Sequence, residues 1–137
     1  MKIVIDANLW ISFAIGKRLN RLEKLLKNPS VEIFHTEQLI TELNDVVQRP
    51  KLAKYINQER RDELFELLLT YSQLISISKK SRRLSRDRKD DYLLELCHKV
   101  GADFLLTGDN DLLVLQEFEC TKIVLFNHFM DTQLNEL

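Results

Sequence analysis

Hydrophobic residues recur along the chain with two alternating periodicities. Short apolar runs rich in β-branched residues are typical of buried strands, and longer segments with an apolar residue every three or four positions are typical of amphipathic helices. The short runs predict strands at residues 2–5, 31–34, 74–77, 103–106 and 123–126. The longer segments predict helices at residues 8–15, 18–27, 37–48, 58–73 and 90–100, with a short helix near residues 112–115.

Residues that start or stop helices stand between these segments. Thr36 is a typical helix N-cap, Gly16 and Gly101 are typical helix stops, and Pro50 ends the helix that precedes it. Because strands alternate with helices throughout, we expect an α/β fold, a three-layer α/β/α sandwich around a mostly parallel, roughly five-stranded sheet. The 137 residues are enough for one domain with a substantial core, so we assign residues 1–137 to a single domain.

The composition excludes several classes of protein. The formal net charge is −1, so overall charge does not predict binding to nucleic acid. Cys97 and Cys120 are too few and too far apart for a zinc site, and they fit a reduced cytosol rather than a disulfide framework. Met1 and Lys2 precede an apolar run, as in a signal peptide, but Asp6 interrupts that run, and no window is apolar enough to span a membrane. We therefore expect a cytoplasmic protein.

Acidic side chains occur where the pattern calls for a loop or for an apolar residue. Asp6 directly follows the first predicted strand, and Asp109 follows the fourth, with Asp111 close by. Glu42 and Asp90 fall in register with the apolar faces of their helices. Ligands of open α/β sheets bind beyond the carboxyl ends of the strands. These carboxylates are therefore candidates for one shared site.

Such a group of carboxylates has a specific chemical requirement. Three or four of them brought together repel one another, and some must then be protonated unless a cation is present. Oxygen ligands without nearby histidine or cysteine select Mg²⁺ or Mn²⁺ over zinc, and these ions also bind phosphate oxygens. A metal of this kind can lower the pKa of a bound water and stabilise a leaving oxygen, which fits phosphodiester hydrolysis.

Each acidic residue, taken singly, also has a structural explanation. Asp6 and Asp109 can be N-caps of the helices that follow them, and Asp90 can cap its own helix. Glu42 can pair with a lysine or arginine across a helix interface. Asp91 points more to the side of its helix than Asp90 and is interpreted first as a solvated neighbour. The joint pattern favours a site, whereas the three histidines have no ligand spacing and are interpreted as structural.

One segment, residues 79–89, differs sharply in composition from the rest of the chain. Seven of its 11 residues are basic. A run of this kind is either a solvated loop or a patch that contacts phosphates. Its candidate RNA-binding residues are Lys79, Lys80, Arg82, Arg83, Arg86, Arg88 and Lys89.

The order and spacing of five segments resemble a PIN-domain protein, of the VapC-like kind identified as the toxin component of toxin–antitoxin pairs. The segments are residues 3–8, 36–43, 49–52, 87–96 and 101–113. The resemblance covers nearly the whole chain, and it depends on all five segments together, because no single one is specific. It implies that four acidic positions form the catalytic and metal-binding site, with further residues in supporting roles. The four positions fall on Asp6, Glu42, Asp90 and Asp109, with Asp111 as a further metal ligand and with Asn8, Thr107 and Asp91 in support, Asp91 being the second choice for the third position.

The resemblance also implies an activity and partners. The family is expected to be a metal-dependent endoribonuclease that uses one or two Mg²⁺ or Mn²⁺ ions. Water attacks the phosphorus in line and leaves a 5′-phosphate and a 3′-hydroxyl. Single-stranded or structured RNA would approach over residues 79–89, whose cations contact phosphates and carry no sequence information. An antitoxin partner and frequent dimerisation are implied as well, and a membrane is not.

Three competing interpretations are weighed against this one. A haloacid-dehalogenase phosphatase needs a second aspartate two residues after the first, and Asn8 stands there. A receiver-like signalling domain needs a lysine after a late strand, and neither Thr107–Asp109 nor Phe126–His128 contains one. A PIN scaffold that only binds RNA or a protein remains open as an alternative to the nuclease.

Overall fold

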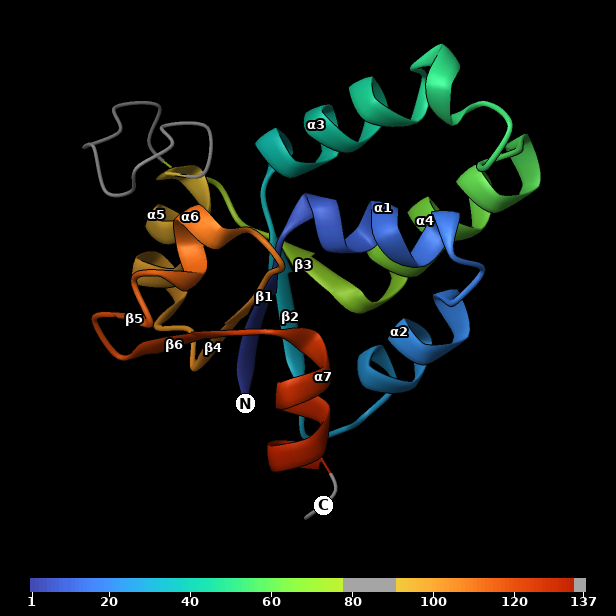
Figure 1. Ribbon diagram of the computed structural model, residues 1–137. Coiled ribbons are helices and arrows are strands. Elements are labelled where there is room, and N and C mark those ends of the chain that lie inside the picture. The colour runs from blue at the N-terminus through green and yellow to red at the C-terminus, as the bar shows by residue number, and fades with distance from the viewer. Residues whose placement is uncertain (78–90, 135–137) are drawn as a thin grey trace.

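The computed structural model describes residues 1–77 and 91–134 (Figure 1). The basic residues 79–89 and the candidate ligand Asp90 lie outside the described residues.

A six-stranded sheet forms the centre of the molecule. Its strands lie in the order β3 (Ser72–Leu74), β2 (Glu32–His35), β1 (Lys2–Ile5), β4 (Phe104–Leu106), β6 (Thr121–Val124) and β5 (Glu117–Phe118). All neighbouring strands are parallel except β5, which runs antiparallel to β6. The predicted α/β class with a mostly parallel sheet is confirmed. The extra strand is the short β5, which at two residues is too brief to show a periodicity in the sequence.

The position of β3 differs from the prediction. The apolar run at residues 74–77 predicts a strand there, but the strand occupies Ser72–Leu74, and α4 (Gln58–Tyr71) ends correspondingly earlier. Ser72 pairs with Ile33 of β2, and its hydroxyl lies 2.6 Å from Nδ1 of the buried His35. Burial lowers the pKa of His35, which fits a neutral, structural histidine. The observed pairing of β3 with β2 thus includes a buried polar contact between Ser72 and His35. Hydrophobic periodicity in the sequence does not reveal a contact of this kind.

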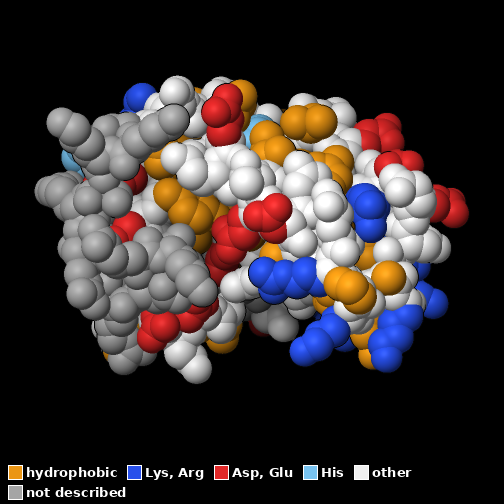
Figure 2. Space-filling model, turned by 90° about the horizontal axis from the view of Figure 1, so that it is seen from above, with side chains coloured by type: hydrophobic (Ala, Val, Ile, Leu, Met, Phe, Trp, Pro, Cys, Tyr) orange, Lys and Arg blue, Asp and Glu red, His pale blue; other side chains and the backbone are white. Residues whose placement is uncertain are grey.

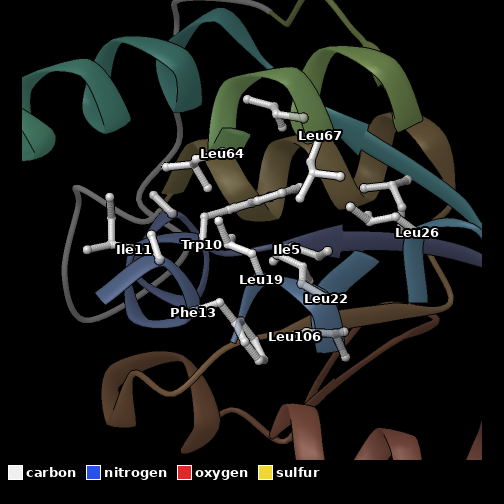
Figure 3. Packing of buried hydrophobic residues seen from close by; sticks show 14 of the residues in the cluster. Ile5, Trp10, Ile11, Phe13, Leu19, Leu22, Leu26, Leu64, Leu67 and Leu106 are labelled. Atoms are coloured by element: carbon white, nitrogen blue, oxygen red, sulfur yellow. The ribbon is translucent and has the colours of Figure 1, made fainter. Parts of the chain in front are cut away.

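Helices cover both faces of the sheet (Figure 1). One hydrophobic cluster joins the sheet to α1 (Ala7–Ile15), α2 (Leu19–Leu26), α3 (Glu37–Val47) and α4, and the other joins it to α5 (Asp91–Val100) and α6 (Asn110–Leu113). Figure 3 shows Trp10 of α1 lying between the leucines of α4 and those of α2 in the first cluster. These two cores make the three predicted layers.

The predicted helix signals are confirmed at their positions. The Thr36 hydroxyl accepts a hydrogen bond from the Leu39 amide at 3.2 Å, which caps α3. Gly16 is the C-cap of α1, and Gly101 follows α5 with a φ of 66°, a backbone conformation that favours glycine. Pro50 begins a short 3₁₀ turn, η1 (Pro50–Leu52), after α3 has ended.

The C-terminal segment departs from the predicted strand at residues 123–126, because β6 ends at Val124 and residues 126–134 are helical. It forms α7 (Phe126–Phe129) and a π-helical turn, η3 (Met130–Leu134). Phe126 packs edge to face against Phe13 at 4.7 Å between ring centroids, and Phe129 packs in the same way against Phe104 at 5.0 Å. Phe126 and Phe129 are three residues apart, so one helical turn buries both rings on one side.

The order in which the chain adds strands to the sheet reverses beside β1. From β1 it passes to β2 and β3 on one side, and it later returns to β4 and β6 on the other. The carboxyl ends of β1 and β4 therefore meet at a topological switch point, where open α/β sheets bind their ligands.

Two further features bear on the class of protein. Among the described helices, none is long and apolar enough to cross a membrane. Both cysteines are free, and burial raises the pKa of the Cys97 thiol to about 12, so this thiol is inert at neutral pH.

Two adjacent leucines on α4 test the assignment of the core. Leu68 is fully buried, whereas Leu69 is 63% exposed. We expect Leu68→Ala to lower the free energy of unfolding by about 2–5 kcal/mol, because it leaves a cavity among packed side chains. Leu69→Ala, the matched control, should change it by less than about 0.5 kcal/mol. Urea unfolding measures both values, and equal values would show that this face of α4 is placed wrongly.

Candidate active site

Asp6 lies at the junction between β1 and β4 and is only 1% exposed. Its backbone amide donates a hydrogen bond to the Leu106 carbonyl at 3.0 Å, which continues the ladder between the two strands. Its side chain accepts two more: Oδ1 from the Asn8 amide at 3.2 Å and Oδ2 from the Thr107 hydroxyl at 2.7 Å. Asp6 is therefore the N-cap of α1, as its structural explanation requires, and it also lies at the edge where a site is expected.

The segment after β4 continues this network. The buried Thr107 hydroxyl also accepts a hydrogen bond from the Asp109 amide at 3.0 Å. Asp109 in turn caps α6, because its Oδ1 accepts from the Asp111 amide at 2.9 Å. One continuous set of hydrogen bonds thus fixes Asp109 relative to Asp6, although the two residues are 103 positions apart in the sequence.

Glu42 approaches the same edge from α3. Its Oε2 accepts a hydrogen bond of 2.5 Å from the hydroxyl of Tyr92, which lies on α5. This hydrogen bond joins a helix from each face of the sheet across the carboxyl edge. Because its donor is a neutral hydroxyl, the Glu42 carboxylate contributes its negative charge to the site.

The pKa of Asp6 shows that these carboxylates interact. Burial raises the pKa of Asp6 most, and the negative charges of Glu42 and Asp109 raise it further. The hydrogen bonds from Thr107 and Asn8 act in the opposite direction, because they stabilise the ionised form. The net effect is a raised pKa. Glu42 and Asp109 thus lie close enough to Asp6 for their charges to oppose its ionisation, and a bound cation would relieve that repulsion.

An acidic cleft of 840 Å³ is lined by Asn8, Glu42 and Asp109, which surround Asp6, although Asp6 itself does not line it. Figure 2 looks onto this edge of the sheet and shows acidic side chains in the middle of the face. The acidic residues that line the cleft are Glu37, Glu42, Asp45 and Asp109, whereas Arg49 is the basic residue among its described lining residues. Tyr92 also lines it, and the segment that follows β3 closes one side.

Asp91 is buried, contrary to its interpretation as a solvated neighbour. It is 1% exposed at the first position of α5. Leu94, one helical turn further on, is fully buried on the same side. The sequence prediction takes the buried face of α5 from its apolar residues alone. In the structure the first turn of the helix is buried as well, so Asp91 is covered although it is not apolar. Asp90 immediately precedes Asp91 and lies outside the described residues.

The residues fit a hard divalent cation in charge and in ligand chemistry. Within residues 1–77 and 91–134, no three acidic, histidine or cysteine side chains form a ready-made group around a metal position. A closed protein cage is not required, since Mg²⁺ keeps several waters and is usually held by one or two carboxylates together with substrate phosphates. The repulsion at Asp6 and the all-oxygen donor set suit such an open site.

Tyr92 contacts Glu42 and lines the acidic cleft, which the sequence pattern does not reveal. It stands one residue after two acidic positions on a helix whose apolar face is already assigned, so the pattern places it on the helix surface. A half-buried tyrosine usually finds a hydrogen-bond partner for its hydroxyl, and that expectation could have linked it to a polar residue of another helix.

The fold and the carboxylate group define an α/β domain with an acidic site at the switch point of its sheet. The chain belongs to the PIN-domain family, since a model described as PIN domain matches residues 2–111. No curated protein matches the sequence significantly.

Several solved structures are similar to this fold, among them the following two. The first, described as the crystal structure of VapBC2 from Rickettsia felis bound to a DNA fragment from their promoter, has a TM-score of 0.58 and 18% identity, covering 90% of this chain and 98% of that chain. The second is a domain of a functionally unknown protein from Methanocaldococcus jannaschii DSM 2661, with a TM-score of 0.54, 17% identity and 90% coverage of both chains. At these identities the similarity concerns the fold alone.

The raised pKa of Asp6 gives a prediction about stability. Because its folded-state pKa lies above the ordinary value of 3.8, ionisation of Asp6 opposes folding once the pH has risen through the folded-state pKa, and this effect is absent below 3.8. In metal-free buffer at pH 7, Asp6→Asn should therefore raise Tm by a few degrees. The gain should shrink as the pH falls toward 3.8.

Thermal unfolding followed by circular dichroism measures this effect. Asp62→Asn is the matched control, because Asp62 is exposed on α4 and does not line the cleft. A lower Tm for Asp6→Asn at pH 7 would mean that the capping hydrogen bonds outweigh the cost of burying the charge.

Proposed function

We propose that the protein is a metal-dependent endoribonuclease. The observation that carries this proposal is the convergence of Asp6, Glu42 and Asp109 at the carboxyl edge of β1 and β4. Burial and the negative charges of Glu42 and Asp109 together raise the pKa of Asp6 there. PIN domains are typically nucleases and typically bind divalent metal, which agrees with this arrangement. The proposed reaction is hydrolysis of RNA phosphodiester bonds.

Asp6, Glu42 and Asp109 would hold Mg²⁺ or Mn²⁺, together with an acid at the start of α5. Asp90 is the first candidate for that acid from the family pattern, and the buried Asp91 is the second. Asp111 is a further candidate ligand. When bound, such a cation activates a water and neutralises charge at the phosphate.

The surrounding residues position these carboxylates. Thr107 donates to Oδ2 of Asp6 and so orients the carboxylate against β4. The Asn8 amide fixes the other oxygen, and the Asn8 side chain is exposed at the rim of the acidic cleft. Tyr92 holds Glu42 from the opposite layer. We propose that the basic residues 79–89 contact the phosphates of the RNA as the RNA approaches the site.

We also propose that the chain is the toxin of a toxin–antitoxin pair. Support comes from the family and from the similarity in fold to the VapBC2 structure from Rickettsia felis, which covers nearly the whole of that chain. A cognate antitoxin protein is then the expected partner.

Cleavage of RNA by wild type and by Asp6→Asn tests the enzyme proposal. With Mn²⁺ or Mg²⁺, wild type should cut a mixed single-stranded RNA, and chelator should abolish the activity. Asp6→Asn and Asp109→Asn should each lower the rate by more than about 100-fold, because even residues that only support metal ligands commonly contribute roughly 10- to 100-fold. Asp62→Asn should cut as wild type does.

Manganese binding, measured by calorimetry, separates the remaining outcomes. Wild type that binds Mn²⁺ but cuts none of the mixed RNA is a nuclease of narrow specificity. Wild type that neither binds Mn²⁺ nor cuts is a PIN scaffold that binds RNA or a protein, and the enzyme proposal is then wrong. Comparing Asp90→Asn with Asp91→Asn in the same assay identifies the ligand at the start of α5.

Tyr92→Phe tests the role of Tyr92 as a positioning residue. The variant removes the hydroxyl that holds Glu42 and keeps the ring. We expect Mn²⁺ affinity to fall roughly tenfold, as for other outer-shell partners of metal ligands, while Tm changes little. Tyr71→Phe is the control, because Tyr71 does not line the cleft. Unchanged Mn²⁺ affinity in Tyr92→Phe would show that Glu42 is held correctly without it.

A further inference from the structure

A second cleft, of 580 Å³, lies beside the acidic one. It is bounded by α1, by the turn that leads into α2, and by the residues that open α7. Asn8 lines both clefts, and the segment after β4 runs between them, with Thr107 and Gly108 in the second and Asp109 in the first. A chain-like ligand that extends from the carboxylate site past Asn8 therefore enters the second cleft.

The charge of the second cleft is opposite to that of the first. Arg18 and Arg21 line it, and none of the described residues that line it is acidic. Figure 2 shows basic and hydrophobic side chains together at one side of the acidic group. A polyanion that spans both clefts would meet carboxylates, and their cation, in one and fixed arginines in the other.

Two side-chain interactions restrain Arg21. Its guanidinium donates a hydrogen bond to Oδ1 of Asn127 at 3.2 Å and lies over the ring of Phe126, 5.6 Å from the centroid. A cation in this position over an aromatic ring is attracted to it. Arg18 stands at the start of α2, where its backbone amide donates to the Phe13 carbonyl at 2.9 Å. Both arginines are therefore attached to a structured wall rather than to a loose loop.

Part of the lining beside the arginines is apolar. Phe13 and Phe126 are only 6% and 5% exposed, so the apolar surface open to a ligand comes from Leu9 and from Leu125, which is 51% exposed. Single-stranded nucleic acids are bound by grooves whose cations follow the phosphate backbone. In this cleft the two arginines provide such cations, and the buried rings of Phe13 and Phe126 are not open for bases to stack on. An acidic peptide would find the same cations, but the second cleft is continuous with the carboxylate site at Asn8, which favours the strand on which that site acts.

We propose that the second cleft binds the single-stranded RNA that flanks the cleaved bond, with Arg18 and Arg21 contacting its phosphates. This inference rests on the proposed nuclease function, because it takes the carboxylate site as the point of cleavage. The strand passes over Asn8 from one cleft to the other. The proposal thereby assigns a basic surface for RNA to residues that the structure describes.

The test is binding of a fluorescently labelled ten-nucleotide single-stranded RNA, followed by anisotropy. It is done in buffer with Ca²⁺ in place of Mn²⁺, and a gel verifies that the RNA stays intact. We expect the double variant Arg18→Gln/Arg21→Gln to bind roughly tenfold more weakly at about 0.1 M salt. The slope of log affinity against log salt should fall by about 0.7 for each phosphate that the variant no longer neutralises.

Two controls protect this test. Lys24→Gln removes a cation from the same helix, α2, at a position outside both clefts, and should bind as wild type does. Arg18→Gln alone guards against a loss of folding in the double variant, since the interactions with Phe126 and Asn127 are made by Arg21. Circular dichroism verifies that each variant is folded.

The outcomes separate this proposal from the nuclease proposal. If wild type binds RNA and folded arginine variants bind it equally well, the second cleft is not an RNA site, whether or not wild type cleaves RNA with Mn²⁺. If wild type binds no RNA, the inference is likewise wrong, and cleavage by wild type decides the nuclease proposal separately. A ten-residue polyglutamate peptide serves as the second probe. If the arginine variants lose only peptide binding, the cleft belongs to an acidic protein partner and the proposal is overturned.

Discussion

The buried carboxylate of Asp6 is the constraint on which the rest of this site depends. An ionised side chain that is 1% exposed is costly, and its two hydrogen bonds compensate for only part of the lost hydration, because its pKa is still raised. Glu42 and Asp109 add repulsion instead of relief. A lone N-cap does not need this environment, since a serine or threonine would cap α1 without the charge. A buried carboxylate that lowers the stability of the fold is expected where a functional site needs negative charge.

The order of strands makes this arrangement possible. Parallel strands put their carboxyl ends on one edge, and placing β1 next to β4 brings residue 6 beside residue 107. Thr107 then serves two acids at once, because its hydroxyl donates to Asp6 and accepts from the Asp109 amide. Glu42 reaches the site from α3, and Tyr92 of the other helical layer donates a hydrogen bond to it. The site therefore depends on all three layers of the fold.

Most strands and helix ends, and the position of Asp6, could be predicted from the sequence, because each is determined by residues close to it in the chain. The apolar run before Asp6, the N-cap at Thr36 and the glycine at residue 101 each report on the backbone within a few residues. The start of β3 and the role of Tyr92 could not be predicted in this way. Each depends on a polar contact with a distant segment, at His35 and at Glu42 respectively. Hydrophobic periodicity says nothing about such contacts. It also fails to predict the burial of Asp91, because a polar residue at the start of α5 does not enter the apolar register.

The net charge of −1 conceals a separation of charge that a nuclease would need. A site that holds a divalent cation must be acidic, and an acidic surface repels the polyanion on which it acts. The structure separates the two requirements in space. Acidic side chains line one cleft, arginines line the next, and uncharged residues, Asn8, Thr107 and Gly108, lie where the two meet. Because screening shortens electrostatic interactions to about 8 Å at physiological salt, neighbouring clefts can keep opposite potentials even though the whole chain is almost neutral.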